Sequence, residues 1–286
     1  MRKFIISDIH GNGNLYYSIM NYLDNISKND EVTLYINGDL IDRGNDSGVI
    51  LLDVIKRIND KSNSFKIIYL GGNHELMMYE LLQKKIKGRN TFFNDWYFNG
   101  GKVTEKYLNS ILRTKEEWLE IIDFIANLKI YHKFDEKIND KNIVLVHAAC
   151  PLFVKDSCNL FIKDNNPVTL YSVWTRENDF PPFKFPIGNR KYFTIIGHTP
   201  VNKSFGYEYN KRGNYLNIDG GSAIYAYDKT IERCYPLVEI ENNYLKILSF
   251  NNHNDIEYAN YFIDKQSIQY SEPELHEAKV FLKRHI

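Results

Sequence analysis

The chain has 286 residues, of which 43% are hydrophobic and 25% are charged, and its 36 Lys and Arg residues balance its 36 Asp and Glu residues. This length supplies enough apolar material for one large domain or two small ones. The zero net charge argues against a protein whose main partner is nucleic acid or an acidic membrane.

The cysteines and the lengths of the apolar runs indicate the cellular compartment of the protein. Three cysteines, Cys150, Cys158 and Cys234, occur without a Cys-x-x-Cys pair, so we expect neither a disulfide framework nor a zinc finger. The apolar run that follows Met1 is too short for a signal peptide, and no later run approaches the roughly 20 apolar residues of a membrane span. The sequence therefore predicts a cytoplasmic protein with no membrane partner.

Three strand-loop-helix units open the chain. Each begins with a short apolar run rich in β-branched residues, breaks into a polar loop, and continues with helical spacing of apolar residues. The expected strands cover residues 4–6, 32–36 and 65–70, and the expected helices cover residues 15–26, 49–58 and 76–85. Three such units in succession predict parallel pairing with right-handed crossovers.

The pattern then changes to a helical excursion at about residues 89–129, broken at Asn99-Gly100-Gly101. We interpret the aromatic residues around Trp96 as the core of this excursion rather than as a base-stacking platform. Further strands are expected over residues 143–146, 192–196, 215–218, 237–240 and 245–248. After residue 251 the chain is polar, with a weak helical pattern over 273–284. We therefore expect one α/β domain over 1–250 and a C-terminal extension over 251–286 that packs on it.

Polar side chains follow several of these strands where each strand ends. They are Asp8, His10, Asp39, Asp42, Arg43, Asn73, His74, His147 and His198. Carboxylates and imidazoles suit a borderline divalent ion such as Mn, Fe or Zn, and two ions about 3.5 to 4 Å apart need one shared carboxylate. We expect Asp8 and His10 to bind one ion, with Asp39 as the bridge. The expected ligands of the second ion are Asn73, His147 and His198.

Such a pair of ions indicates phosphoryl chemistry. A hydroxide held between two metals attacks phosphorus in line while the metals clamp the phosphoryl oxygens. His74 is then the expected general acid for the leaving oxygen, and Asp42 the carboxylate that orients it. Arg43 offers a planar fork for the remaining phosphate oxygens. Taken singly, each residue has a structural alternative, such as a helix cap for Asp8 or Asp39 or a salt bridge for Arg43.

The motifs Asp8-x-His10-Gly11, Gly38-Asp39-Leu40-x-Asp42-Arg43-Gly44 and Gly72-Asn73-His74-Glu75 resemble the signature of the PPP-type metallophosphatases, which belong to the calcineurin-like metallophosphoesterases. Trp96-x-x-Asn99-Gly100-Gly101 is similar to the bacterial and bacteriophage lambda-type branch. The resemblance implies an α/β fold of two packed mixed β-sheets flanked by helices. It also implies a second phosphate-binding arginine, at Arg176, which has a structural salt bridge as its alternative. Ser7 stands where the family usually has Gly, and no ligand position is lost.

The expected function is hydrolysis of phosphoserine or phosphothreonine, or of phosphotyrosine, in a phosphoprotein partner, with two manganese ions or alternatively Fe or Zn. A first alternative is a symmetric dinucleoside tetraphosphate or nucleotide-cap hydrolase. The resemblance argues against it, because those hydrolases typically carry Ala where Asp42 stands and Asp where Glu75 stands. A second alternative is a scaffold protein with a degenerate site.

Overall fold

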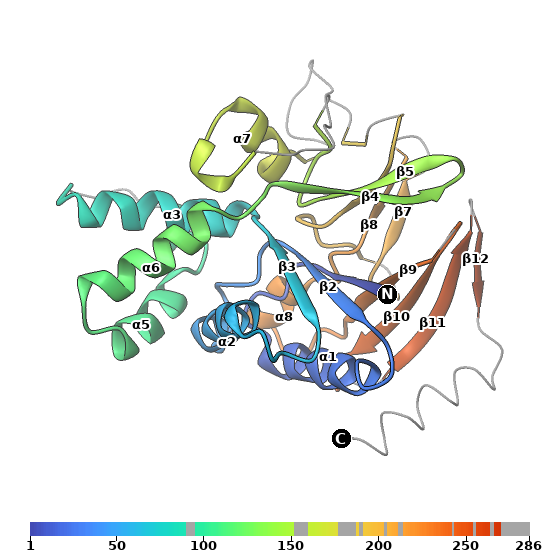
Figure 1. Cartoon of the computed structure of the whole chain (residues 1–286), viewed down its shortest axis with the longest axis horizontal. Coiled ribbons are helices and arrows are strands. Elements are labelled where there is room, and N and C mark those ends of the chain that lie inside the picture. Colours follow the sequence, from blue (N-terminus) through green and yellow to red (C-terminus); the bar gives the residue numbers. More distant parts are fainter. Residues whose placement is uncertain are drawn as a thin grey trace.

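The computed structural model describes residues 1–89, 95–151, 160–176, 187–188, 191–202, 205–210, 214–241 and 243–253, together with the backbone of 256–263 and 266–269. Two mixed β-sheets pack face to face, and helices cover the outer face of the larger sheet (Figure 1). This architecture confirms the expected fold class.

The larger sheet has its parallel part where the sequence predicts it. Strands β1 (Arg2–Ile6), β2 (Val32–Asn37) and β3 (Lys66–Leu70) pair in parallel, in that order. Every residue of β2 is buried, as expected for a parallel strand covered on both faces. Helices α1 (Gly13–Ile26), α2 (Ser47–Asn59) and α3 (Asn73–Ile86) follow these strands.

Four antiparallel strands complete the larger sheet on the other side of β1. They are β9 (Cys234–Glu241), β10 (Tyr244–Asn251), β11 (Ile256–Ile263) and β12 (Gln266–Gln269). The last two were not expected from the sequence, because Glu and Asn interrupt the Ile, Tyr and Phe residues of β11. β11 pairs with β10 along most of its length, so residues just beyond 251 extend the same sheet. The division at residue 250 stays a prediction, and the helical pattern over 273–284 lies outside the described residues.

The smaller sheet has the order β4-β5-β6-β8-β7. Its strands are β4 (Tyr131–Ile138), β5 (Lys141–Val146), β6 (Phe193–Ile196), β7 (Glu208–Asn210) and β8 (Tyr215–Asn217). The edge strands β4 and β7 were not expected. In β4 only Tyr131, Phe134 and Ile138 are buried, and an irregular register between Lys133 and Lys137 breaks the period-two alternation that identifies a strand.

The apolar core fills two layers. One lies between the sheets, where Ile5 and Tyr35 from the larger sheet pack with Leu145, Phe193 and Ile195 from the smaller one. The other lies between the larger sheet and the helices α1, α2 and α3. The strands are thus held on both faces, which fixes the positions of the loops at their ends.

The helical excursion consists of α4 (Asp95–Phe98), α5 (Lys102–Ile111) and α6 (Lys115–Ala126), and it projects beside α3 in Figure 1. The break at residues 99–101 is confirmed: Gly100 has a φ of +96°, and a Cβ on Gly101 would overlap the Trp96 indole. Trp96 is fully buried, as the interpretation of a helical core required.

The remaining short helices are η1 (Ile162–Asp164), α7 (Pro167–Trp174) and α8 (Ser222–Tyr227). Cys150 and Cys234 are buried free thiols, and Cys158 lies outside the described residues. Among the described helices, none combines the length and apolar character that crossing a membrane requires.

Candidate metal centre

The carboxyl ends of strands from both sheets meet at one place, and each delivers a polar side chain there. β1, β2 and β3 of the larger sheet are parallel, as are β5, β6 and β8 of the smaller one. The residues that follow these six strands are Asp8 and His10, Asp39 and Asp42, Asn73 and His74, His147, His198, and Asp219. All nine are buried. This edge of an α/β assembly is where ligand sites are typically found.

The turns that present these side chains have an uncommon backbone. Six site residues have a positive φ, from 45° to 75°: Asp8, His10, Asp39, Asp42, Arg43 and His198. Residues other than glycine seldom adopt this left-handed conformation, and such strain concentrates at functional sites. Gly38 makes the close approach possible, because a Cβ there would lie 2.7 Å from both His147 Nδ1 and the Cα of Gly72. The turns after β2, β3 and β5 therefore pack directly against one another.

One cluster of donor atoms gathers around Asn73. Its Oδ1 lies 3.1 Å from His147 Nε2 and 2.9 Å from His198 Nδ1, and His147 Nε2 lies 3.3 Å from Asp39 Oδ1. Donor atoms at about 2.1 Å from an ion in octahedral geometry are about 3.0 Å apart, so these separations fit one coordination sphere. The carboxylate and imidazole groups of Asp39, His147 and His198 form a cluster that can hold a metal ion.

Three of the four histidines at the site have a backbone partner that fixes the ring. His10 Nδ1 lies 3.0 Å from the Ile41 carbonyl oxygen, His147 Nδ1 lies 2.8 Å from that of Asn37, and His198 Nε2 lies 3.1 Å from that of Trp174. A ring nitrogen that donates to a carbonyl leaves the opposite nitrogen for a metal. His147 Nε2 and His198 Nδ1 are the nitrogens that point into the cluster, and His198 Nε2 also accepts from the Arg176 Nε–H.

A second cluster shares Asp39 with the first and contains His10 and His74. Asp39 Oδ2 lies 3.5 Å from His10 Nε2 and 3.8 Å from His74 Nε2. Asp39 therefore directs one carboxylate oxygen to each cluster, which is the arrangement that a bridging ligand needs, and its role as the bridge stays a prediction. Asp8 lies outside both clusters, and its carboxylate accepts hydrogen bonds from the His198 backbone N–H and the Ser7 hydroxyl.

Charge is distributed unevenly in this buried site. Burial alone would raise the pKa of Asp39, but the imidazoles of His147, His74 and His10 hold the pKa of this carboxyl well below its usual range. Burial and the neighbouring Asp219 raise the pKa of Asp8 well above its usual range. Four buried carboxylates, those of Asp8, Asp39, Asp42 and Asp219, thus gather near the single guanidinium of Arg43, and such a site is a suitable environment for divalent ions.

His74 and Asp42 form a hydrogen-bonded pair beside the second cluster. His74 Nδ1 lies 2.7 Å from Asp42 Oδ2, and both side chains are buried. Burial lowers the pKa of His74, but the carboxylates of Asp39 and Asp42 outweigh burial and raise it. His74 is thus favoured in its protonated form.

Two residues of the helical excursion hold Asp42 in turn, and the sequence assigned neither of them a role at the site. Trp96 Nε1–H donates to Asp42 Oδ2 at 2.7 Å, and the Thr104 hydroxyl donates to Asp42 Oδ1 at 2.5 Å. The Thr104 oxygen also accepts from the Asp42 backbone N–H at 3.2 Å. Trp96 could have been identified from the sequence, because it precedes the Asn-Gly-Gly motif. No sequence feature distinguished Thr104.

The two expected phosphate-binding arginines lie on opposite sides of the site. Arg43 Nη2 is 3.2 Å from His74 Nε2, and Arg43 Nε is buried with no hydrogen-bond acceptor among the described residues. Arg176 is exposed, and its Nε is 3.2 Å from His198 Nε2. An anion placed between Arg43 and His74 would accept hydrogen bonds from both.

Two further buried acids belong to the site, although the sequence assigned them no role. Glu75 accepts from the backbone N–H groups of Asp39, Leu40 and Gly72 at 2.9, 3.1 and 2.8 Å, and from the Tyr69 hydroxyl at 2.7 Å. It therefore ties the loop after β2 to the loop after β3. Asp219 is buried, and burial together with nearby Asp39 raises its pKa to about 6. In the sequence, Glu75 could have been identified from the Asn-His-Glu motif, and Asp219 from the Ile-Asp pair that follows β8.

Comparison with protein families gives a match over residues 1–224 to the family model described as calcineurin-like phosphoesterase. A search of curated protein sequences gives no match. The family and the Asp and His clusters together suggest a dinuclear metal site.

Solved structures with a similar fold include a cold-active protein-tyrosine phosphatase of Shewanella sp., at 16% identity and a TM-score of 0.53 over 87% of this chain and 77% of that one. A protein serine/threonine phosphatase from Saccharomyces cerevisiae matches at 13% identity and a TM-score of 0.50 over 95% of this chain and 82% of that one. At such identities the likeness concerns the fold alone.

Proposed function

The chain belongs to the calcineurin-like phosphoesterase family, and from this membership we propose that it is a metal-dependent phosphoprotein phosphatase acting on phosphoserine and phosphothreonine. Membership of the family supports a metallophosphoesterase, which is a hydrolase, without specifying the substrate. The observation that carries the finer proposal is the His74–Asp42 pair, 2.7 Å apart and adjacent to the shared ligand Asp39. Hydrolysis of an ester with a poor leaving group needs a proton donor at that place.

The residues present fit a pair of divalent ions. We assign Asn73, His147 and His198 to one ion and His10 to the other, with Asp39 shared. Asp8 stays a predicted ligand of the second ion, although its carboxylate lies outside both clusters. When bound, the two ions would acidify a water molecule and polarise the phosphoryl oxygens. Imidazole, amide and carboxylate donors together suit manganese, with iron or zinc as alternatives.

His74 is the proposed general acid. Its Nδ1 bonds Asp42, and its Nε2 faces the space beside Asp39 and Arg43, where the Arg43 Nη2–H donates to it. A phosphate that took this N–H would leave Nε2 to carry a proton. In this geometry His74 gives its Nε2 proton to the leaving seryl or threonyl oxygen, and Asp42 stabilises the imidazolium before the transfer. Trp96 and Thr104 keep the Asp42 carboxylate in place.

The two arginines are the proposed phosphate contacts. The Nε–H of Arg43 lacks an acceptor among the described residues, which suits a phosphate oxygen. Arg176 lies on the side of His198 and is exposed, so it meets a substrate that arrives from solvent. We propose a phosphoprotein or phosphopeptide as the substrate and not a nucleic acid, given the balanced charge of the chain. The free thiols Cys150 and Cys234 support a reducing cytoplasm as the location.

Three substrates assayed side by side, with and without manganese, test this proposal. They are a phosphothreonine peptide, a phosphotyrosine peptide and diadenosine tetraphosphate. We expect metal-dependent turnover with the highest kcat/KM on the phosphothreonine peptide. A preference of about tenfold for the dinucleotide, equivalent to about 1.4 kcal/mol, would replace the proposal with the phosphoanhydride hydrolase. Absence of turnover on every substrate with metal present would favour a degenerate site.

A further inference from the structure

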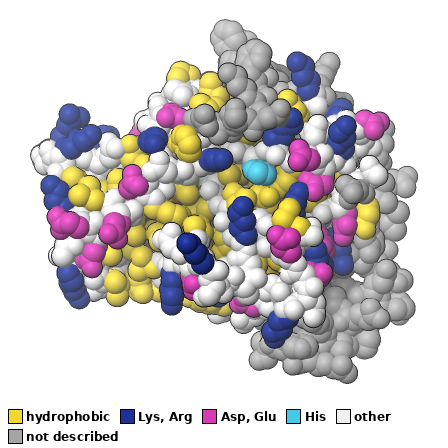
Figure 2. Space-filling view, viewed as in Figure 1, with side chains coloured by type: hydrophobic (Ala, Val, Ile, Leu, Met, Phe, Trp, Pro, Cys, Tyr) yellow, Lys and Arg dark blue, Asp and Glu magenta, His cyan; other side chains and the backbone are white. Residues whose placement is uncertain are grey.

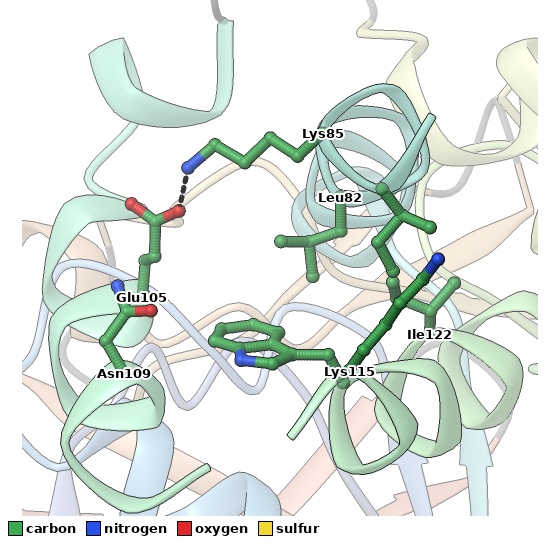
Figure 3. Close-up of a pocket in the computed structure, with 8 residues that line it drawn as sticks. Leu82, Lys85, Glu105, Asn109, Lys115 and Ile122 are labelled. Atoms are coloured by element: carbon green, nitrogen blue, oxygen red, sulfur yellow. Dashed lines mark hydrogen bonds and ion pairs between the residues drawn. The ribbon is translucent and has the colours of Figure 1, made fainter. Parts of the chain in front are cut away.

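A cavity of about 380 Å³ lies between α3, α5 and α6, away from the metal centre. Figure 3 shows its walls: Leu82 and Lys85 from α3, Glu105 and Asn109 from α5, and Lys115 and Ile122 from α6. Eight residues separate Leu82 from His74 along α3, which corresponds to about 12 Å at 1.5 Å per residue. A volume of this size is typical of a site for a small organic ligand.

The lining of the cavity has one apolar surface and a net positive charge. Leu82, Ile86, Trp118 and Ile122 form the apolar surface. Figure 2 shows hydrophobic side chains at the surface over α3, α5 and α6, with charged side chains among them. The two lysines of the lining, Lys85 and Lys115, oppose the single carboxylate of Glu105, which leaves one positive charge. An aromatic ring suits the apolar surface, and an anionic group suits the net positive charge.

The lining also carries polar groups that are available to a ligand. The Lys85 ammonium is already bound to Glu105 and to the Tyr97 hydroxyl. Within the part of the chain that the structure describes, by contrast, the side chains of Lys115 and Asn109 form no hydrogen bond or ion pair. Lys115 therefore offers an uncompensated charge at the α6 end of the cavity, and Asn109 offers a neutral donor and acceptor at the α5 end.

The helices around this cavity hold the acid pair of the metal centre. α5 packs mainly on α2 and carries Thr104, whereas α6 packs on α3, which begins at Asn73 and His74. Glu105 of the cavity wall directly follows Thr104, and its partner Tyr97 directly follows Trp96. Both Thr104 and Trp96 donate to Asp42. A ligand that spans the cavity thus joins the helix that carries Thr104 to the helix that carries His74.

We propose that this cavity binds a small aromatic carboxylate, with the carboxylate at Lys115 of α6 and the ring between Leu82 and Trp118 and against Asn109 of α5. We propose further that the bound ligand, by joining α5 to α3, favours the aligned Asp42–His74 pair. Binding of the ligand to the cavity is independent of the proposed function. The regulatory effect rests on the proposed function, because this effect is observed as a change in turnover.

The binding test uses 1-naphthoate as the probe, with its neutral amide 1-naphthamide as the isostere, measured by titration calorimetry on the manganese-loaded protein. We expect 1-naphthoate to bind with a Kd on the order of 1 mM or tighter, and the amide at least about fivefold more weakly. Saturating inorganic phosphate should leave binding unchanged. Equal binding of the amide, or displacement by phosphate, would overturn the proposal, since displacement means that the probe sits at the metal centre.

Three variants locate the site. Lys115→Ala should weaken 1-naphthoate binding at least about fivefold, and Asn109→Trp should block it by filling the cavity. Lys84→Ala, which removes an exposed lysine of α3 outside the lining, is the matched control and should bind as the wild type does. Loss of binding in Lys84→Ala, or retention in both other variants, contradicts the assignment.

The regulatory part is tested with an aryl phosphate as substrate. Saturating 1-naphthoate should raise kcat at least about twofold in the wild type and leave it unchanged in Asn109→Trp. Binding without any change in kcat would overturn the regulatory part. If the protein turned over no phosphate ester at all, the proposed function would fail, whereas the calorimetric test of the cavity would still stand.

Discussion

His74 Nδ1 lies 2.7 Å from Asp42 Oδ2, while Nε2 of the same ring lies 3.8 Å from Asp39 Oδ2. The His74 imidazole therefore contacts both the Asp42 carboxylate, which orients it, and the Asp39 carboxylate, which the two clusters of possible metal ligands share. Substitution of His74 by Asn should remove the proton donor and leave the proposed ligands Asn73, His147 and His198 in place. We expect kcat on a phosphothreonine peptide to fall by about 10²- to 10⁴-fold, with manganese affinity changed little.

The comparison variant for this experiment is Asp39→Asn, which should lose manganese affinity as well as turnover. Calorimetric manganese titration of both variants separates the two roles. Full activity of His74→Asn on a substrate with a poor leaving group would show that the proton comes from elsewhere.

The pH profile of turnover should change when Asp42 is replaced by Asn. A general acid works in its protonated form, so kcat is lost as the pH rises through the pKa of His74. The carboxylates of Asp39 and Asp42 raise that pKa against the effect of burial. Removing the Asp42 charge lowers the pKa, and the alkaline limb of kcat should move to lower pH. Asp53→Asn, a surface change at a residue that bonds Tyr16 and Arg57, is the control and should leave the limb in place.

The two donors from the helical excursion should affect turnover without affecting metal binding. Trp96→Phe and Thr104→Val each remove one hydrogen bond to the buried Asp42 carboxylate, at a cost of about 1 to 3 kcal/mol. If part of this cost appears in the transition state, kcat falls by about three- to tenfold. Tyr107→Phe, an aromatic change on α5 outside the cavity lining, provides the comparison. Equal effects of Trp96→Phe and Tyr107→Phe would indicate a general loss of helix packing.

Glu75 should prove important for both stability and metal affinity. Its carboxylate accepts three backbone N–H groups and the Tyr69 hydroxyl, and it has no exposed surface. In Glu75→Gln the amide NH₂ group faces donors, so at least one of them loses its acceptor. The free energy of unfolding should fall by about 2 to 4 kcal/mol, measured by denaturant titration, and the Kd for manganese should rise. Glu80→Gln, at a half-buried residue of α3 that accepts from Asn165, should change neither quantity by a comparable amount.

The parallel strands and the residues at their ends were predictable from the sequence. Buried parallel strands are continuous apolar runs, and the polar residues that follow them, such as Asp39 after β2 and His147 after β5, are visible against those runs. The helices α1 and α2 were equally clear, because their buried positions repeat with helical spacing, whereas the first six residues of α3 are all buried.

The edge strands were not predictable in the same way, because their sequences are not continuous apolar runs. β4 and β11 both contain charged or amide side chains between their apolar residues. The residue of α5 that holds Asp42 could not be predicted for a different reason. Thr104 reaches Asp42 from 62 positions away in the chain, and nothing in the local sequence of α5 distinguishes that threonine from an ordinary helix residue.

The central claim is that Asp39 is shared by two metal ions whose other ligands come from separate strand ends. Anomalous diffraction from manganese-soaked crystals tests it most directly. We expect two anomalous peaks about 3.5 to 4 Å apart on either side of the Asp39 carboxylate, one beside Asn73, His147 and His198 and the other beside His10. A single peak, or two peaks that do not share Asp39, would contradict the account.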